Sequence, residues 1–196
     1  VMFLRVYWNG GNIWLRDRKG LADMLGREPT EMEYQVRNWY HFTWASGDNI
    51  CEQHVHNLDV ANWIMNDHPI EANGMGGCQV RNKRSESQIF DHHAVEYTYK
   101  NGTKMFSQCC QIDGWPGNVS EAVHGTKGSG GPTRGRGNGN PYVIEHIDLI
   151  KAIRNNDKYN EGWHGATSTM TAVLGRMATY SGQVVKWDDA VAKGEA

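Results

Sequence analysis

The spacing of hydrophobic and polar residues changes along the chain, from a strand-like to a helical pattern. Residues 1–8 are rich in valine and aromatic residues, which predicts a strand ending near Trp8. A loop that carries Trp14 and is interrupted by glycines follows, and Gly26-Arg-Glu-Pro29 is typical of a turn. From Trp44 to Asn66 the apolar residues recur at helical spacing, until the proline of His68-Pro69 ends the pattern.

Residues after Pro69 have the period of strands. Val95, Tyr97 and Tyr99 alternate with polar residues, and Asn101-Gly102 is a strong signal for a hairpin turn. The strands expected here cover Ile70 to Val80, Ile89 to Tyr99, Met105 to Ile112 and Glu121 to Thr126.

The last part of the chain is predicted to be helical. A glycine-rich stretch from Gly128 to Pro141, with Arg134 and Arg136, is expected to be a solvated loop and lacks the context of a phosphate-binding turn. Two amphipathic helices are predicted, over Tyr142 to Arg154 and Gly165 to Tyr180, with Gly182 as the cap of the second. Strands joined by hairpins, with helices before and after, predict an α+β domain whose mostly antiparallel sheet carries helices on one face.

Length and charge limit the classes of protein. A chain of 196 residues with 39% hydrophobic content is expected to form one domain around one core. The formal charge of −2 gives no field that would attract nucleic acid or an anionic membrane, and no apolar run approaches the roughly 20 residues that span a bilayer. Residues 1–8 do not resemble a signal peptide. The compartment stays open: cytoplasmic by default, or periplasmic if an export signal lies upstream.

The four cysteines, Cys51, Cys78, Cys109 and Cys110, have no CxxC spacing. We expect them to pack as small hydrophobic side chains rather than to form a zinc ribbon or a disulfide framework.

Three titratable residues form the main candidate for chemistry. If the segment is one helix at about 100° per residue, then Glu52, His56 and Asp59 fall within roughly 60° of one another, with His54 on the opposite side. A carboxylate one turn from an imidazole suits the histidine to exchange a proton with a substrate hydroxyl. The same pattern also fits a solvated helix face. Zinc binding would need a third ligand, which His92, His93 or His124 could provide only through the fold.

Aromatic and basic residues before this helix are candidates for substrate binding. Arg37, Trp39 and Tyr40 could stack on a sugar ring and donate to its hydroxyls, although core packing explains some of them equally well. Trp115, in the turn Gly114-Trp-Pro-Gly-Asn118, is a similar candidate. His92, His93 and His124 are also candidates for substrate binding. Because neighbouring residues of a strand point to opposite faces, at most one of His92 and His93 is expected to enter any one site.

The run Gly47-Asp-Asn-Ile-Cys-Glu52-Gln-His-Val-His56-Asn-Leu-Asp59 resembles the second-domain motif of the glucose–fructose oxidoreductase, inositol dehydrogenase and rhizopine-catabolism (Gfo/Idh/MocA) family. Further segments are similar in the same order and extend the resemblance over nearly the whole chain. They are Asp91-His-His-Ala-Val-Glu-Tyr97, Val123-His-Gly-Thr-Lys-Gly128, Pro141-Tyr-Val-Ile-Glu-His-Ile-Asp148 and Ser181-Gly-Gln-Val-Val-Lys-Trp187.

The resemblance implies the C-terminal domain of an oxidoreductase that acts on a sugar or polyol with NAD or NADP. It implies His56 as the acid or base, Glu52 as its partner or as an acceptor for a substrate hydroxyl, and Asp59 in a supporting position. It also implies a dimer or tetramer formed through the free face of the sheet. The family's dinucleotide-binding domain and its EKP lysine are not in this sequence, so the chain alone is expected not to transfer hydride.

Two residues depart from the family motif: Glu52 stands where aspartate is usual, and His54 where glycine is usual. Either change could alter the substrate or the reaction. Two other functions therefore stay open: a metal- or cofactor-assisted glycoside hydrolase or lyase on the same scaffold, and a non-catalytic module for oligomerisation or ligand binding.

Overall fold

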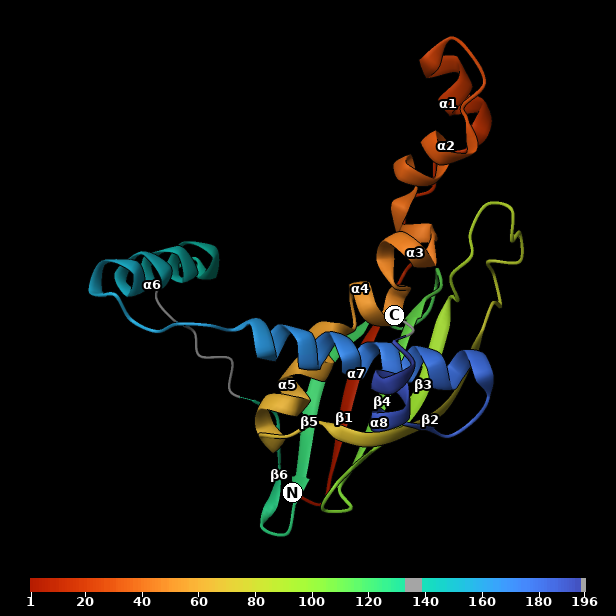
Figure 1. Ribbon diagram of the computed structural model, residues 1–196. Helices are drawn as coiled ribbons and strands as arrows, with labels where there is room; N and C mark the ends of the chain where they lie inside the picture. Colours follow the sequence, from red (N-terminus) through yellow and green to blue (C-terminus); the bar gives the residue numbers. More distant parts are fainter. Residues whose placement is uncertain (133–138, 195–196) are drawn as a thin grey trace.

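The computed structural model describes residues 1–132 and 139–194. Its centre is a seven-stranded sheet with the order β6-β5-β1-β4-β3-β2-β7 (Figure 1). The strands are β1 Phe3–Gly10, β2 Pro69–Gly77, β3 His92–Tyr99, β4 Lys104–Gln111, β5 Asn118–Gly125, β6 Gly128–Gly130 and β7 Val185–Lys186. Each strand that the sequence predicts is present, with ends shifted by a few residues.

The sheet is mixed but mostly antiparallel. β1 and β4 form the one parallel pair among the described strands, and every other neighbouring pair runs antiparallel. β3 and β4 are joined at Asn101-Gly102, where Gly102 has a φ of 82° that favours glycine. The predicted α+β class is therefore confirmed.

One face of the sheet carries the core. Val95, Tyr97 and Tyr99 of β3 point to this face, as the alternation in the sequence predicts. The helices α5 Val55–Met65 and α7 Gly162–Ser181 pack over it (Figure 1). Other core residues on these helices and strands are Leu4, Val6, Leu58, Ala61, Met105, Cys109, Ala172, Leu174 and Ala178.

The predicted helix from Trp44 to Asn66 is three helices rather than one. They are α3 Thr43–Ser46, α4 Asn49–Glu52 and α5 Val55–Met65. The first break lies at Gly47 and Asp48, which have φ values of 73° and 80°, outside the range of a right-handed helix. The second break is a turn at Gln53 and His54.

The second break brings His54 into the core. Its Nδ1 lies 3.2 Å from Asn57 Oδ1, and its Nε2 lies 2.7 Å from Ser107 Oγ on β4. A buried imidazole requires such partners, and the helical pattern of apolar residues does not reveal them. The hydrogen bonds to His54 therefore help to fix the turn between α4 and α5.

Burial lowers the pKa of His54 to about 3, from an ordinary value of 6.5. Between these two values the unfolded chain binds a proton that the folded chain does not. The free energy of unfolding should therefore rise with pH over this window, by up to about 1.4 kcal/mol per pH unit. Urea denaturation between about pH 4.5 and 6.5, where carboxylates are largely ionised, should show this slope in the unaltered chain and a smaller one in His54→Gln. Equal slopes in the two proteins would contradict the assignment.

Two helices between β1 and α3 are not predicted from the sequence: α1 Arg18–Leu25 and α2 Glu31–Arg37. Asp17 caps α1, and Thr30 with Glu33 forms a capping box at the start of α2. The predicted turn at Gly26 to Pro29 does separate them, with Gly26 in the left-handed conformation. Both helices are only about two turns long and form a lobe at one end of the molecule (Figure 1), with a small core of Leu21, Tyr34 and Phe42. Such short segments give little periodicity for a prediction.

The helix α6 Pro141–Asn155 extends away from the sheet (Figure 1). It confirms the predicted helix, but none of its residues is buried. Its large apolar side chains are all exposed: Tyr142, Val143, Ile144, Ile147, Leu149, Ile150 and Ile153. The predicted second helix is α7, and Gly182 caps it with a φ of 66°.

The remaining predictions concern cysteines and the glycine-rich stretch. All four cysteines are free; Cys109 and Cys110 are buried, and Cys51 and Cys78 are partly exposed. The stretch expected to be a loop contains the short strand β6 at its start. Arg134 and Arg136 lie outside the described residues.

Candidate functional site

A groove of about 570 Å³ lies between α5 and the start of α7. His56 and Asp59, one turn apart on α5, both line it. The other lining residues are Val55, Trp63, Glu161, His164, Gly165, Ser168 and Thr169. Two of the three residues predicted for catalysis therefore share one site.

Asp59 joins the two walls of this groove. Its Oδ1 accepts a hydrogen bond of 2.5 Å from Ser168 Oγ on α7. The imidazole of His56 is exposed, and its ring centre lies 5.8 Å from that of Trp8 on β1. The groove thus presents an accessible imidazole beside a carboxylate that is held in place, which suits proton exchange with a bound hydroxyl.

Seven of the nine lining residues are not predicted from the sequence, and three of these have side chains suited to binding or proton exchange: Trp63, Glu161 and His164. Trp63 lies one turn beyond Asp59 and is 72% exposed, an unusual position for so large an apolar side chain. Its spacing from His56 and Asp59 could have identified it. Glu161 and His164 come from the other end of the chain, so only the fold brings them to the groove.

Glu52 does not line the groove. It is the last residue of α4, and the turn at Gln53 and His54 separates it from His56. Its Oε2 accepts a 2.6 Å hydrogen bond from Gln53 Nε2, and its carboxylate accepts another from the Tyr40 hydroxyl. The described residues include no hydrogen bond or ion pair between Glu52 and His56. The prediction that both share a face depended on an unbroken helix, and that assumption was wrong.

Tyr40 belongs to a buried polar network behind Glu52. Its hydroxyl accepts a 2.7 Å bond from Gln111 Nε2, and Gln111 Oε1 accepts a 2.7 Å bond from the guanidinium of Arg81. Burial and the charge of Glu52 raise the pKa of Tyr40, so it stays a neutral donor. Tyr40 thus holds Glu52 rather than facing the groove.

Arg37 and Trp39 are also away from the groove. Arg37 is the last residue of α2, and its carbonyl accepts a bond from Arg16. Trp39 packs on Tyr40 with ring centres 5.4 Å apart. Both residues belong to the helical segments that follow β1 in the chain.

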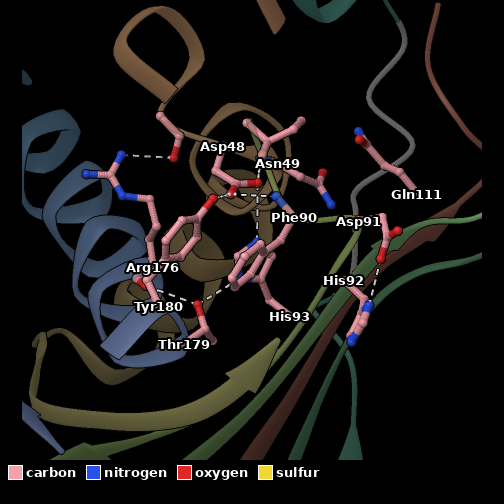
Figure 2. Close-up of polar contacts among 12 residues, drawn as sticks. Asp48, Asn49, Phe90, Asp91, His92, His93, Gln111, Arg176, Thr179 and Tyr180 are labelled. Carbon is pink, nitrogen blue, oxygen red and sulfur yellow. Dashed lines mark hydrogen bonds and ion pairs between the residues drawn. The ribbon is translucent and has the colours of Figure 1, made fainter. Parts of the chain in front are cut away.

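His93 lies in a buried cluster on the core side of β3 (Figure 2). Its Nε2 is 3.2 Å from Asp48 Oδ1, and its Nδ1 is 2.9 Å from Thr179 Oγ1. The other oxygen of Asp48 accepts bonds from the Tyr180 hydroxyl at 2.6 Å and the backbone N–H of Phe90 at 3.1 Å. Burial raises the pKa of Asp48, but His93 and these donors outweigh it and hold the pKa below its usual range. This cluster ties α4, β3 and α7 together.

His92 points to the opposite side of β3, where its Nδ1 lies 2.7 Å from Asp91 Oδ1 (Figure 2). The two imidazoles therefore point to opposite faces of β3, as predicted, but the expectation that at most one of the two residues enters any one site was wrong, since both line one small cavity. His92 lines a small cavity with Trp115, whereas His124 stacks on Phe3 and bonds Ser129 Oγ at 2.8 Å. These candidates are on the sheet and not in the groove of His56.

Dinucleotide binding requires a strand, a glycine-rich turn and a helix N-terminus that receives the pyrophosphate. β1 and α1 are the part of the described chain nearest to this order, but the carboxylate of Asp17 already occupies the N-terminus of α1, with Oδ1 2.6 Å from the Gly20 N–H. A second anion there would be repelled. The N-terminus of α1 therefore does not fit the pyrophosphate of a dinucleotide.

Across the described residues, no cluster of three or more His, Cys, Asp or Glu side chains is arranged to hold a metal ion. Within the same part of the chain, no helix combines the length and apolarity needed to cross a bilayer.

The same arrangement of sheet and helices occurs in several solved dehydrogenases and oxidoreductases. The scyllo-inositol dehydrogenase of Lactobacillus casei, solved with NAD(H) and scyllo-inositol, matches with a TM-score of 0.67 and 14% identity, over 95% of this chain and 56% of that one. The myo-inositol dehydrogenase of Corynebacterium glutamicum matches with a TM-score of 0.62 and 14% identity, over 94% of this chain and 55% of that one. The aldose-aldose oxidoreductase of Caulobacter crescentus, complexed with glycerol, matches with a TM-score of 0.67 and 11% identity, over 94% of this chain and 55% of that one.

These likenesses confirm the fold that the sequence resemblance implies, the C-terminal domain of Gfo/Idh/MocA oxidoreductases. The chain spans little more than half the length of the structures that it matches. No protein-family model matches it, and no curated protein matches it by sequence.

Proposed function

We propose that this chain is the substrate-side domain of an NAD- or NADP-dependent oxidoreductase acting on a sugar, polyol or related hydroxylated compound. The observation that carries the proposal is the groove of His56, in which an accessible imidazole, a fixed carboxylate and an exposed indole meet. The fold supports it, since the L. casei protein of the same fold is solved with scyllo-inositol. The decisive test is turnover of the complete polypeptide after replacement of His56.

In this proposal His56 accepts the proton of the substrate hydroxyl as that carbon is oxidised, and returns it in the reverse direction. Asp59 supports the site from the same helix turn, because its bond to Ser168 fixes the distance between α5 and α7. Trp63 offers an apolar face to the C–H side of the ring. Glu52 lies outside the groove, so the proposal gives it neither a contact with the substrate nor a role as the partner of His56.

NAD or NADP, held by a dinucleotide-binding domain of the complete polypeptide, would supply the hydride-accepting chemistry. In this proposal the contribution of this chain is to bind the substrate and to move its proton. We place such a domain next to α6. This helix leads into the start of α7, where Glu161 and His164 line the groove, and its large apolar side chains are all exposed.

We also propose that the complete protein is a dimer or tetramer that uses the sheet face opposite α5 and α7. This face carries Phe106 and Met75, which are 43% and 75% exposed. Exposed apolar side chains on an uncovered sheet are typical of subunit contacts. Sedimentation of the chain, with Phe106→Lys as the altered protein, would test association.

Removal of the indole should weaken substrate binding with little effect on the chemical step. Trp63 is 72% exposed and does not belong to the hydrophobic core, so Trp63→Ala should fold normally. We expect KM for the sugar or polyol to rise about tenfold, since an aromatic face contributes roughly 1–2 kcal/mol. Steady-state kinetics would measure this, with Trp44→Ala, another exposed tryptophan outside the groove, as the control. An unchanged KM would exclude Trp63 from the site.

A further inference from the structure

A second cavity, of about 100 Å³, lies on the other side of the sheet. It is at the end of β1 and β4, next to the turn that carries Trp115. Its lining residues are Asn9, Gln79, His92, His93, Ala94, Gln108, Cys109, Cys110, Ile112 and Trp115.

The alternation of β1 separates this cavity from the groove of His56. Trp8 points to the core side, where its ring lies near His56, and Asn9 therefore points to the opposite side. Asn9 Nδ2 donates to Gln108 Oε1 at 3.3 Å, which places the two amides side by side on β1 and β4. The cavity is thus a distinct place for a ligand.

The imidazole of His92 is held in position. Its partner Asp91 is fully buried and accepts hydrogen bonds from the backbone N–H groups of Gln79, Val80 and Arg81, at 3.0, 2.6 and 2.9 Å. Burial raises the pKa of Asp91, but these bonds and the one from His92 outweigh it and keep the group ionised. An ionised carboxylate fixes the proton of His92 on Nδ1, which leaves Nε2 available to a ligand.

The chemistry of the lining points to an uncharged ligand. No Asp, Glu, Lys or Arg side chain is among the lining residues. The polar groups are the amides of Asn9, Gln79 and Gln108 with the imidazole, and the indole of Trp115 is 46% exposed. Amides beside one exposed aromatic ring recognise the hydroxyls and the C–H face of a carbohydrate.

We propose that this cavity binds a neutral hydroxylated small molecule, a triol or one edge of a sugar ring, independently of the groove of His56. The volume of about 100 Å³ limits the ligand to this size, since it is smaller than the apolar cavity of about 150 Å³ that accepts benzene. The proposal goes beyond the oxidoreductase function: it assigns a second carbohydrate site on the far side of the sheet.

The test is an NMR titration of the 196-residue chain, labelled with ¹⁵N in its tryptophans, against myo-inositol and, separately, glycerol. The indole N–H signals of Trp115 and Trp63 are assigned from the spectra of Trp115→Ala and Trp63→Ala. We expect at least one probe to shift the Trp115 signal in a saturable manner, and His92→Ala to raise its Kd about tenfold. Phe106→Ala, on the same sheet face but outside the cavity, should leave the Kd unchanged.

Trp63→Ala separates this proposal from the oxidoreductase function. It should remove any response from the groove of His56 and leave the Trp115 shift intact. The proposal is overturned if neither probe gives a saturable Trp115 shift, if His92→Ala leaves the Kd unchanged, or if the shift disappears in Trp63→Ala. It is equally overturned if Trp115→Ala changes only the sedimentation coefficient, because the cavity would then belong to a contact between copies of the chain.

Discussion

Gly175→Ala should destabilise the chain by about 2–3 kcal/mol, although alanine is the better helix former. Gly175 lies in α7 against β3, and an added Cβ would come within 1.9 Å of Tyr97 Oη and 3.0 Å of Ile50 Cδ1. Tyr97 is fully buried, so its ring has no free space to move into. Urea denaturation would measure the loss.

Gly165→Ala provides the matched control, because it makes the same change in the same helix where an added Cβ meets nothing within 4 Å. It should stabilise the chain by up to about 1 kcal/mol through helix propensity. The Tyr97 hydroxyl has no hydrogen-bond partner among the described residues, so Tyr97→Phe should be tolerated and should reduce the cost of Gly175→Ala. If Gly175→Ala raised stability as Gly165→Ala does, the close packing of α7 on β3 would be wrong.

His56→Ala should lower kcat of the complete polypeptide by about 10²–10⁴-fold, the usual contribution of a positioned acid or base. His56 is exposed, so the variant should keep its fold and its melting temperature. Kd for NAD or NADP should change little, because the proposal places the dinucleotide site in another domain of the complete polypeptide. Steady-state kinetics with a sugar alcohol, together with a cofactor titration, would measure both quantities.

His68→Ala is the control for this variant, since His68 stacks on Trp187 and lies outside the groove. It should keep its turnover. A loss of turnover in both variants would indicate a general effect on the fold, and unchanged turnover in His56→Ala would remove His56 from the mechanism.

Local pattern was sufficient for the long strands, but not for their order in the sheet or for the short strands β6 and β7. Each long strand has an apolar alternation or a hairpin turn of its own, and Val95, Tyr97 and Tyr99 identify the core face of β3 directly. The helices α6 and α7 were predictable for the same reason. α1 and α2 were not, because each has only two turns and is defined by its caps.

The candidate site was predictable only within one helix. His56 and Asp59 lie on α5, so helical spacing places both in the groove correctly. Glu52 lies across a turn that depends on the contacts of His54 with Asn57 and Ser107, and a periodicity argument does not include such contacts. Glu161 and His164 are close to His56 only through packing of α7 on α5.

The second cavity was likewise not predictable from the sequence as one site. The sequence marks His92 and Trp115 as candidates separately, but their meeting depends on the end of β4 and the turn that follows it. Of the vicinal histidines, alternation along β3 shows only that one faces the core and the other does not.

The most direct measurement of the central claim is the turnover of His56→Ala in the complete polypeptide as imidazole is added to the solution. If the side chain of His56 moves the substrate proton, free imidazole should enter the exposed groove and restore part of the lost turnover in a saturable manner, while Trp63→Ala shows no such rescue. If imidazole restores no turnover, or if His56→Ala is as active as the unaltered protein, proton transfer by His56 is contradicted.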